Sequence, residues 1–195
     1  MFTGIIESAG VIEDISARSI TVSTDLPPLD PGESIAVDGV CLTVTSWESK
    51  AFTADLSEET LGRTTLGQLI AAGRVNLERP MAASARFGGH IVQGHVDGVG
   101  NIVEISEFEG SREVSIEAPE ALRRYLVVKG SVAIDGVSLT VASLEGATFR
   151  VALIPHTLGA TTFGSKAKGD SVNIETDIIA KYVERLLGAE KEDQQ

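Results

Sequence analysis

The sequence contains two copies of one unit. Displacing the 195-residue chain against itself by 97 positions aligns residues 33–79 with residues 130–176 without a gap, and 21 of these 47 pairs are identical. The beginning of the unit repeats more loosely, with residues 2–6 matched to residues 96–100, so we place the start of the second copy between His90 and His95. A repeat of this length predicts two structural units of the same fold. We expect domains at residues 1–92 and 93–177.

Each copy has the pattern of antiparallel β-strands. In the first copy Asp38 and Gly39 form a two-residue hairpin signal, because both residue types tolerate the positive φ that the favoured turns require. Apolar and small polar residues alternate after this turn, and again after Asp135 in the second copy. Further runs at residues 10–15, 19–24, 51–56 and 74–78 are spaced like the strands of a small barrel or sandwich. Short helices are expected within residues 60–73 and 157–169.

A barrel of this size has an interior just wide enough for its own side chains, so a ligand has to bind on the outside. The outward positions after each hairpin turn are small and polar. They are Cys41 and Thr43 in the first copy, and Ser138 and Thr140 in the second. These two faces are the candidate binding surfaces.

The chain after Thr176 changes to a helical pattern. Six apolar residues recur at helical spacing between residues 178 and 187, Asp177 or Thr176 can cap the start, and Gly188 can end the helix. A helix of about a dozen residues is marginal in isolation, so its apolar stripe must pack on something. We expect a helix at residues 178–188 that serves oligomerisation or docks on the second barrel, and a flexible tail at 189–195.

Composition argues against several classes of partner. The formal net charge is −12 and the pI is about 4.6, which does not suit binding to nucleic acid or to anionic lipid surfaces. Cys41 is the single cysteine, which excludes an intrachain disulfide and a multi-cysteine zinc site and suits the reducing cytoplasm. The N-terminus does not have the form of a signal peptide, and no apolar run is long enough to span a membrane.

Several residues could carry chemistry, and each also has a plainer interpretation. Cys41 aligns with Ser138 of the second copy. It is either a small residue that fills a strand face, or a residue that acts as a weak nucleophile or proton donor. His95 is an acid–base candidate at the junction of the two copies. His90 is expected only to satisfy backbone groups there, and His156 to occupy a loop where ligand contacts often collect. Asp177 can cap a helix, act on a ligand, or do both.

Four acidic residues receive a structural interpretation. Asp38 and Asp135 are expected to be turn residues, and Glu78 and Glu175 to be solvated strand ends. Lys129 is ordinarily a surface charge, although it could reach a neighbouring binding surface.

Other catalytic signatures are missing from the sequence. It contains no P-loop, no G-x-S-x-G elbow and no dinucleotide fingerprint in a strand-to-helix setting. His90 and His95 are five residues apart, which on a strand places them on opposite faces and makes them a poor metal pair. We therefore expect neither a cofactor nor a metal.

Seven segments taken in order resemble the riboflavin synthase family, which is built from duplicated lumazine-binding barrels. They are MFTGII, DGVCLTV, NLERPM, FGGHIVQGHVDG, DGVSLTV, LIPHTLGATTFG and VNIETD, and the likeness extends over residues 1–188. The resemblance implies two six-stranded antiparallel Greek-key barrels in tandem and a C-terminal helix. It also implies a transferase of riboflavin biosynthesis that needs no cofactor. Such an enzyme dismutates two molecules of 6,7-dimethyl-8-ribityllumazine into riboflavin and 5-amino-6-ribitylaminouracil.

The resemblance also implies an assembly. In that family the facing barrels come from neighbouring subunits of a homotrimer, whose active sites hold two lumazines each. Holding two identical substrates close and antiparallel lets them react in opposite roles. A lumazine synthase shell is a further partner with which the protein could associate.

Site residues follow from the resemblance position by position. Residues implicated in catalysis or in holding donor and acceptor are Ser34, Cys41, His95, Ser138 and Asp177. The first-barrel site would use Gly4, Ile5, Ile6, Cys41, Leu42, Thr43, Asp55, Leu56, Ser57, Glu58, Glu59 and Thr60. The second-barrel site would use Gly94, His95, Val96, Lys129, Ser138, Leu139, Thr140, Leu153, Ile154, Pro155, His156, Thr157 and Leu158.

Two other functions compete with this one. Non-catalytic lumazine-binding antenna proteins are similar to the family, but a protein that needs one ligand has no reason to keep two intact sites. A purely structural protein made of twin barrels would leave the paired polar faces unexplained.

Overall fold

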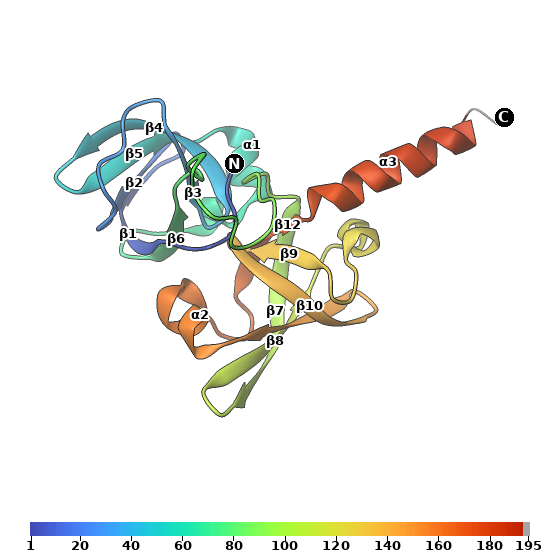
Figure 1. Ribbon diagram of the computed structural model, residues 1–195. Helices are drawn as coiled ribbons and strands as arrows, with labels where there is room; N and C mark the ends of the chain where they lie inside the picture. The colour runs from blue at the N-terminus through green and yellow to red at the C-terminus, as the bar shows by residue number, and fades with distance from the viewer. Residues whose placement is uncertain (193–195) are drawn as a thin grey trace.

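The computed structural model describes residues 1–192, which form two β-barrels and a projecting helix (Figure 1). The strands of the first barrel are β1 (Ser8–Ile15), β2 (Ser19–Ser23), β3 (Ser34–Val37), β4 (Val40–Glu48), β5 (Ala51–Asp55) and β6 (Arg74–Glu78). Those of the second are β7 (Gly98–Phe108), β8 (Ser111–Glu117), β9 (Ser131–Ile134), β10 (Val137–Glu145), β11 (Thr148–Leu153) and β12 (Ser171–Thr176).

Both barrels are closed and have the same topology. The first runs β1-β2-β5-β4-β3-β6, and the second, read from β7, runs β7-β8-β11-β10-β9-β12. All the paired strands are antiparallel, and the order of the middle strands is that of a Greek key. The predicted fold of two six-stranded antiparallel barrels is confirmed.

The hairpin turns form as their sequences predict. Asp38 and Gly39 have φ values of 44° and 75°, and Asp135 and Gly136 have values of 45° and 79°. These positive values suit the mirror-image turns that match the twist of the flanking strands. After the first turn Leu42 points into the barrel, whereas the positions on either side of it, 41 and 43, face outward.

Short helices close the barrels between their last strands. They are α1 (Glu58–Arg63) with the 3-10 turn η1 (Thr65–Gln68), and α2 (Pro155–Ala160) with η3 (Thr162–Gly164); a further turn, η2 (Glu120–Tyr125), follows β8. Ser57 caps α1 by accepting a hydrogen bond from the Thr60 backbone. Pro155 instead starts α2 at a position where its missing N–H is not needed. Both expected short helices are therefore present, and each begins two residues before the segment in which it was expected.

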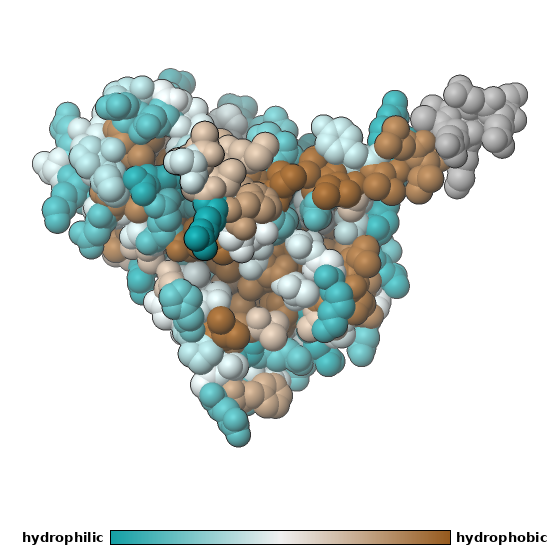
Figure 2. All heavy atoms as spheres, in the orientation of Figure 1, coloured by the Kyte–Doolittle hydropathy of each residue, from teal (hydrophilic) through white to brown (hydrophobic). Residues whose placement is uncertain are grey.

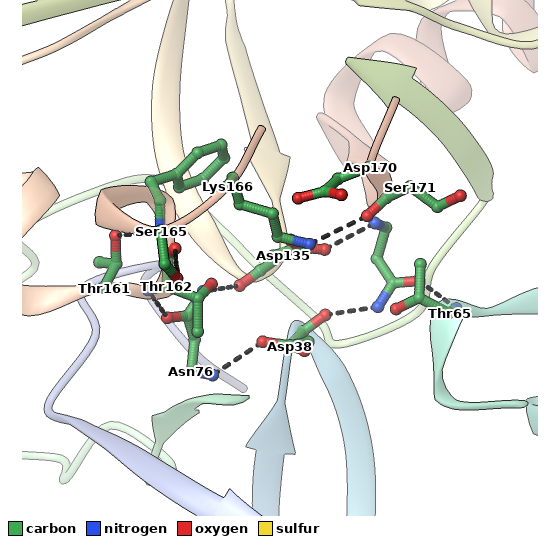
Figure 3. Close-up of polar contacts among 12 residues, drawn as sticks. Asp38, Thr65, Asn76, Asp135, Thr161, Thr162, Ser165, Lys166, Asp170 and Ser171 are labelled. Atoms are coloured by element: carbon green, nitrogen blue, oxygen red, sulfur yellow. Dashed lines mark hydrogen bonds and ion pairs between the residues drawn. The ribbon is translucent and has the colours of Figure 1, made fainter. Parts of the chain in front are cut away.

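The two barrels are joined at a polar centre on their hairpin turns (Figure 3). Gly39 and Gly136 approach so closely that a Cβ on Gly39 would lie 2.6 Å from the Gly136 nitrogen. The Asn76 side chain donates to the Asp135 carbonyl at 2.9 Å, and Asn173 donates to the Asp38 carbonyl at 2.8 Å. These reciprocal contacts make an approximate two-fold relation between the barrels.

The C-terminal helix α3 (Ile178–Glu192) leaves the second barrel and projects into solvent (Figure 1). Asp177 caps it, because its side chain accepts from the Ile179 N–H at 2.9 Å. The helix is longer than the predicted 178–188: it passes through Gly188, since the residues that follow favour helix and a single exposed Gly costs only about 1 kcal/mol. The remainder of the predicted tail, 193–195, lies outside the described residues.

An apolar stripe on α3 is exposed (Figure 2). Leu186 is 70% exposed and Tyr182 is 65% exposed, and Ile179, Val183 and Leu187 are also solvent-facing. Among the described residues, no helix combines the length and apolar character that crossing a membrane would require.

Candidate functional site

Each barrel is covered by a segment that is anchored on the other barrel. We name residues 2–7 the first arm and residues 92–97 the second arm. Gly4 of the first arm accepts a hydrogen bond from the Ser138 N–H at 2.8 Å, and Gly94 of the second arm accepts one from the Cys41 N–H at 2.9 Å. Ile6 packs against the core of the second barrel and Val96 against the core of the first. The arms are therefore crossed.

Glycine makes these close approaches possible. A Cβ on Gly4 would lie 2.6 Å from the Ser138 Cβ, and one on Gly94 would lie 2.6 Å from the Cys41 Cβ. Both glycines have φ near the left-handed region, at 77° and 80°. A side chain at either position would both clash and strain the backbone.

The crossing corrects the predicted grouping of site residues. The first site, which we define as the face of the first barrel carrying Cys41 and Thr43, is next to residues 94–96 and not to residues 4–6. The second site, the face carrying Ser138 and Thr140, is next to residues 4–6. The grouping carried over from the family resemblance placed each arm with its own copy, because matching residues position by position does not show which segments lie side by side.

The register of the arms also differs from the prediction. Gly94 lies 90 positions after Gly4, and each donates its N–H to the equivalent glutamate. The alignment of residues 2–6 with residues 96–100 is therefore wrong. The spacing rises from 90 at the start of β7 to 94 at the end of β8, because the β7–β8 hairpin is longer than the β1–β2 hairpin. The longer connection from β8 to β9, which contains η2, brings the spacing to 97.

Two buried glutamates anchor the arms. Glu78 accepts from the Thr3 and Gly4 backbones at 2.7 and 2.9 Å, and Glu175 accepts from Gln93, Gly94 and His95 at 2.7 to 3.0 Å. Their expected role as solvated strand ends is wrong. Burial raises the pKa of both carboxyls, and the backbone N–H groups oppose that rise.

The first site combines a strand face with the start of α1. Cys41 is half-buried on β4, Thr43 is exposed on the same strand, and Ser34 pairs with Thr43 from β3. The predicted residues at the end of β5 and in α1 are mostly exposed, namely Asp55, Ser57, Glu58, Glu59 and Thr60. Leu56 among them is buried. Leu42 points into the core.

The second site has the same parts. Ser138 is half-buried and Thr140 exposed on β10, whereas Leu139 and Leu153 are buried. The segment around α2 presents Ile154, Pro155, His156, Thr157 and Leu158, of which the first three are exposed. Lys129 is exposed just before β9.

The second site contains a hydrogen bond that the sequence did not predict. The Nδ1 atom of His90 lies 2.7 Å from the Ser138 Oγ atom, and the imidazole is buried. Its Nε2 atom is also buried and has no hydrogen-bond partner within residues 1–192. Burial lowers the pKa of His90, and the charge of Asp177 opposes this shift. The imidazole is therefore uncharged near pH 7 and can accept a proton. The expectation that His90 serves only backbone groups is wrong.

His95 and Asp177 are thus divided between the sites. His95 follows Gly94 and is exposed beside Cys41, with its N–H bonded to Glu175. Asp177, by contrast, acts electrostatically on His90 of the second site. The predicted capping role of Asp177 is confirmed, and its charge also favours the protonated form of His90.

A groove of about 510 Å³ runs along the first arm. Ile5, Leu29, Arg79, Met81 and Gly88 are among the residues that line it. Gly88 contacts Ile5, and the following Gly89 packs against Ser138. The groove therefore lies beside the second site.

Comparisons with known proteins agree with this geometry. The lumazine binding domain family matches residues 3–80 and 93–177, that is, both barrels. The riboflavin synthase of Actinobacillus pleuropneumoniae is 50% identical over 193 residues, covering 96% of this chain and 90% of that protein. The riboflavin synthase of Mycobacterium tuberculosis (H37Rv) is 48% identical over 197 residues, covering 96% of this chain and 98% of that protein.

Solved structures give the same result at the level of the fold. Two structures of LumP, in complex with 6,7-dimethyl-8-(1'-D-ribityl) lumazine and with riboflavin, superpose with TM-scores of 0.80 and 0.83. Each is 25% identical in sequence and covers 90% of this chain and 99% of the other. Two duplicated barrels with a polar face on each, and relatives at this identity over nearly the whole chain, lead to one assignment: the chain belongs to the riboflavin synthase family and is an enzyme of that type.

Proposed function

We propose that this chain dismutates two molecules of 6,7-dimethyl-8-ribityllumazine. A four-carbon unit passes from the donor to the acceptor, giving riboflavin and 5-amino-6-ribitylaminouracil. The observation that carries the proposal is the pair of sites on one scaffold, which share topology and hydroxyl-bearing faces but differ at Cys41 and Ser138. Two identical substrates with opposite roles require two similar sites with different chemistry.

The second site supplies a proton acceptor. A neutral His90 that carries its proton on Nε2 accepts the Ser138 hydroxyl proton at Nδ1, across 2.7 Å. This makes the Ser138 oxygen a better base or nucleophile. We assign to this pair the removal of a proton from the acidic 7-methyl group of the bound lumazine, and Asp177 stabilises the imidazolium that results.

The first site supplies weaker polar groups. Cys41 and the exposed His95 adjoin each other across the Gly94 contact, and Ser34 and Thr43 flank them on β3 and β4. Backbone groups at such strand faces can bind the pyrimidine-like edge of the ring, and the small side chains leave room for it. We assign to Cys41 and His95 the handling of the nucleophile that adds at C7 of the second lumazine.

We also propose that the enzyme is a cytoplasmic homotrimer in which the sites of neighbouring subunits face each other. The exposed apolar stripe of α3 supports this, because exposed apolar patches of this kind mark association surfaces (Figure 2). The expected reaction uses no cofactor. Sedimentation equilibrium should give three times the chain mass, and a fully active monomer would overturn the arrangement.

The decisive experiment is incubation of the purified protein with the lumazine. The proposed function predicts the appearance of riboflavin by absorbance and fluorescence, with one riboflavin formed for two lumazines consumed. Stoichiometric binding of the lumazine without formation of riboflavin would instead indicate a non-catalytic, antenna-type lumazine-binding protein.

Single substitutions test the assignment of residues. Replacing Cys41, His95, Ser138 or Asp177 by Ala should lower turnover, with the largest loss at Ser138. Wild-type rates in all four variants would contradict the site assignment even if the protein is a riboflavin synthase.

A further inference from the structure

Asp97, at the end of the second arm, joins that arm to α3. Its Oδ1 atom accepts a hydrogen bond from the Lys181 ammonium at 2.6 Å, and its Oδ2 atom accepts from the Thr176 N–H at 2.8 Å and from the Thr176 hydroxyl at 2.9 Å. Both charged side chains are mostly buried, with 19% of Asp97 and 25% of Lys181 exposed. Such a charge-assisted, partly buried contact holds its partners more firmly than a surface ion pair.

The first arm has the same anchor with a different cation. Glu7 is equivalent to Asp97, and it accepts from the Arg79 backbone at 2.7 Å and from the Arg79 guanidinium at 2.7 and 3.0 Å. Arg79 occupies the repeat position of Thr176, immediately after the last strand of its barrel. The second copy therefore lacks the cation within its barrel and takes it from the helix.

The second arm bears directly on the first site. Gly94 packs against Cys41, and Val96 packs against the core of the first barrel. Glu175 accepts from the backbone of residues 93–95, and at the end of the arm Asp97 accepts from Thr176 and Lys181. We infer that Lys181 is a positioning residue: through Asp97, the helix α3 holds the second arm, with His95, against Cys41 of the first site.

This inference connects the helix that we propose for assembly with the geometry of one of the two sites. Seating α3 orders the second arm, and the first arm is independent of it because Arg79 provides its own cation. The value of this link for catalysis rests on the proposed function, but the link itself is a contact within one chain. It can therefore be tested without substrate.

The test uses Cys41, the only cysteine, as a probe of the second arm. We measure the labelling rate of its thiol by 5,5'-dithiobis(2-nitrobenzoate) in the full-length protein without ligand. Lys181→Met removes the charge and keeps an unbranched side chain that favours helix. Because the arm opens more often without its anchor, we expect the labelling rate to rise roughly fivefold, and Lys181→Arg to restore most of the original rate.

Two matched variants separate this role from general loosening. Arg124→Gln breaks the ion pair between Arg124 and Glu184, which also seats α3 but does not touch Asp97. Glu7→Gln weakens the equivalent anchor of the first arm. Both should leave the labelling rate of Cys41 unchanged, and sedimentation should show the same assembly for all variants.

A double-mutant cycle completes the test. If Lys181 acts through Asp97, Asp97→Asn raises the rate as Lys181→Met does, and the double variant is no faster than either. An unchanged rate in Lys181→Met, or an equal rise in Arg124→Gln, overturns the inference. Neither outcome bears on whether the protein makes riboflavin, which the lumazine assay decides separately.

Discussion

The two barrels have the same strand order and the same hairpin turns, yet they obtain the partners for their buried charges in different ways. Among the described residues, Asp38 of the first barrel forms no ion pair and accepts from the Asn76 N–H at 2.7 Å, whereas Asp135 of the second lies 2.9 Å from the Lys166 ammonium. The repeat position of Lys166 in the first copy is Leu69. Duplication thus supplied a symmetric frame, and a few unequal substitutions gave its two halves different chemistry.

The largest effect is expected from removing the charge of Asp135, which is compensated by the Lys166 ammonium. Asp135 is fully buried, and Asp135→Asn leaves Lys166 without its partner in a site where burial already opposes its charge. The free energy of unfolding should fall by about 3 kcal/mol, as measured by urea denaturation at pH 7.

A matched pair of variants controls this result. Lys166→Met should also destabilise the protein, because it leaves Asp38 and Asp135 as neighbouring buried carboxyls. The double variant should lose less than the sum of the two single losses. A strictly additive double variant would show that the pair does not act as a unit.

The second prediction concerns the serine–histidine pair, which has no equivalent at Cys41 within the described residues. His90→Ala should reduce kcat about 100-fold, the usual size of a lost general base. Cys41→Ser, which makes the two sites more alike, should reduce kcat less than tenfold by the same reasoning. Equal losses in the two variants would contradict the division of roles.

The pH profile sharpens the same point. Because burial lowers the pKa of His90 from its ordinary value of 6.5, the imidazole stays neutral as the medium becomes moderately acidic. The rate should therefore fall only below pH 6.5, as protonation removes the base. His90→Ala should abolish this acid limb, and its persistence in that variant would assign it to another group.

The third prediction separates the arms. Gly94→Ala places a Cβ against Cys41 of the first site, and Gly4→Ala places one against Ser138 of the second. Each should cost about 2 kcal/mol of stability, from strain and clash together. Thiol labelling of Cys41 should accelerate in Gly94→Ala alone, whereas acceleration in Gly4→Ala would contradict the crossed arrangement.

The smallest expected effect is opposite in sign to the first. Burial and the neighbouring Asp135 raise the pKa of Asp38, so the folded protein holds this proton more tightly than the unfolded chain. Its favourable contribution is complete below the ordinary pKa of 3.8 and is lost as the pH rises through the raised value. Asp38→Asn keeps the hydrogen-bond acceptor and removes the charge, so it should stabilise the protein by roughly 1 kcal/mol at pH 8 and less at pH 5. A loss of stability at pH 8 would show that Asp38 is needed as a carboxylate.

Local patterns made much of the fold predictable from sequence. The turn at Asp38 and the alternation after it depend only on neighbouring residues, and the 97-residue repeat is visible when the sequence is compared with itself. The structure confirms all three. The cap at Asp177 was predictable for the same reason.

Contacts between distant segments were not predictable. Glu78 ends a strand and looks solvated in the sequence, but it is buried by an arm 74 residues away. The bond from His90 to Ser138 joins residues 48 apart, and no local pattern marks it. A signal was present nonetheless: Gly4 and Gly94, each within an arm and shortly before a strand, indicate close backbone approach in both copies.

The crossed arms also set an order of events during synthesis. When the ribosome has made residue 80, every strand of the first barrel exists, but Gly94, which contacts Cys41, and Val96, which packs against the core of this barrel, do not. The first arm meanwhile lacks its hydrogen-bond partner Ser138, which is synthesised much later. Although domains generally fold as units from the N-terminus, here neither site can be completed by its own half. A nascent chain therefore gains its two sites only after both copies have begun to leave the ribosome, and a fragment cut between the barrels would carry two incomplete ones.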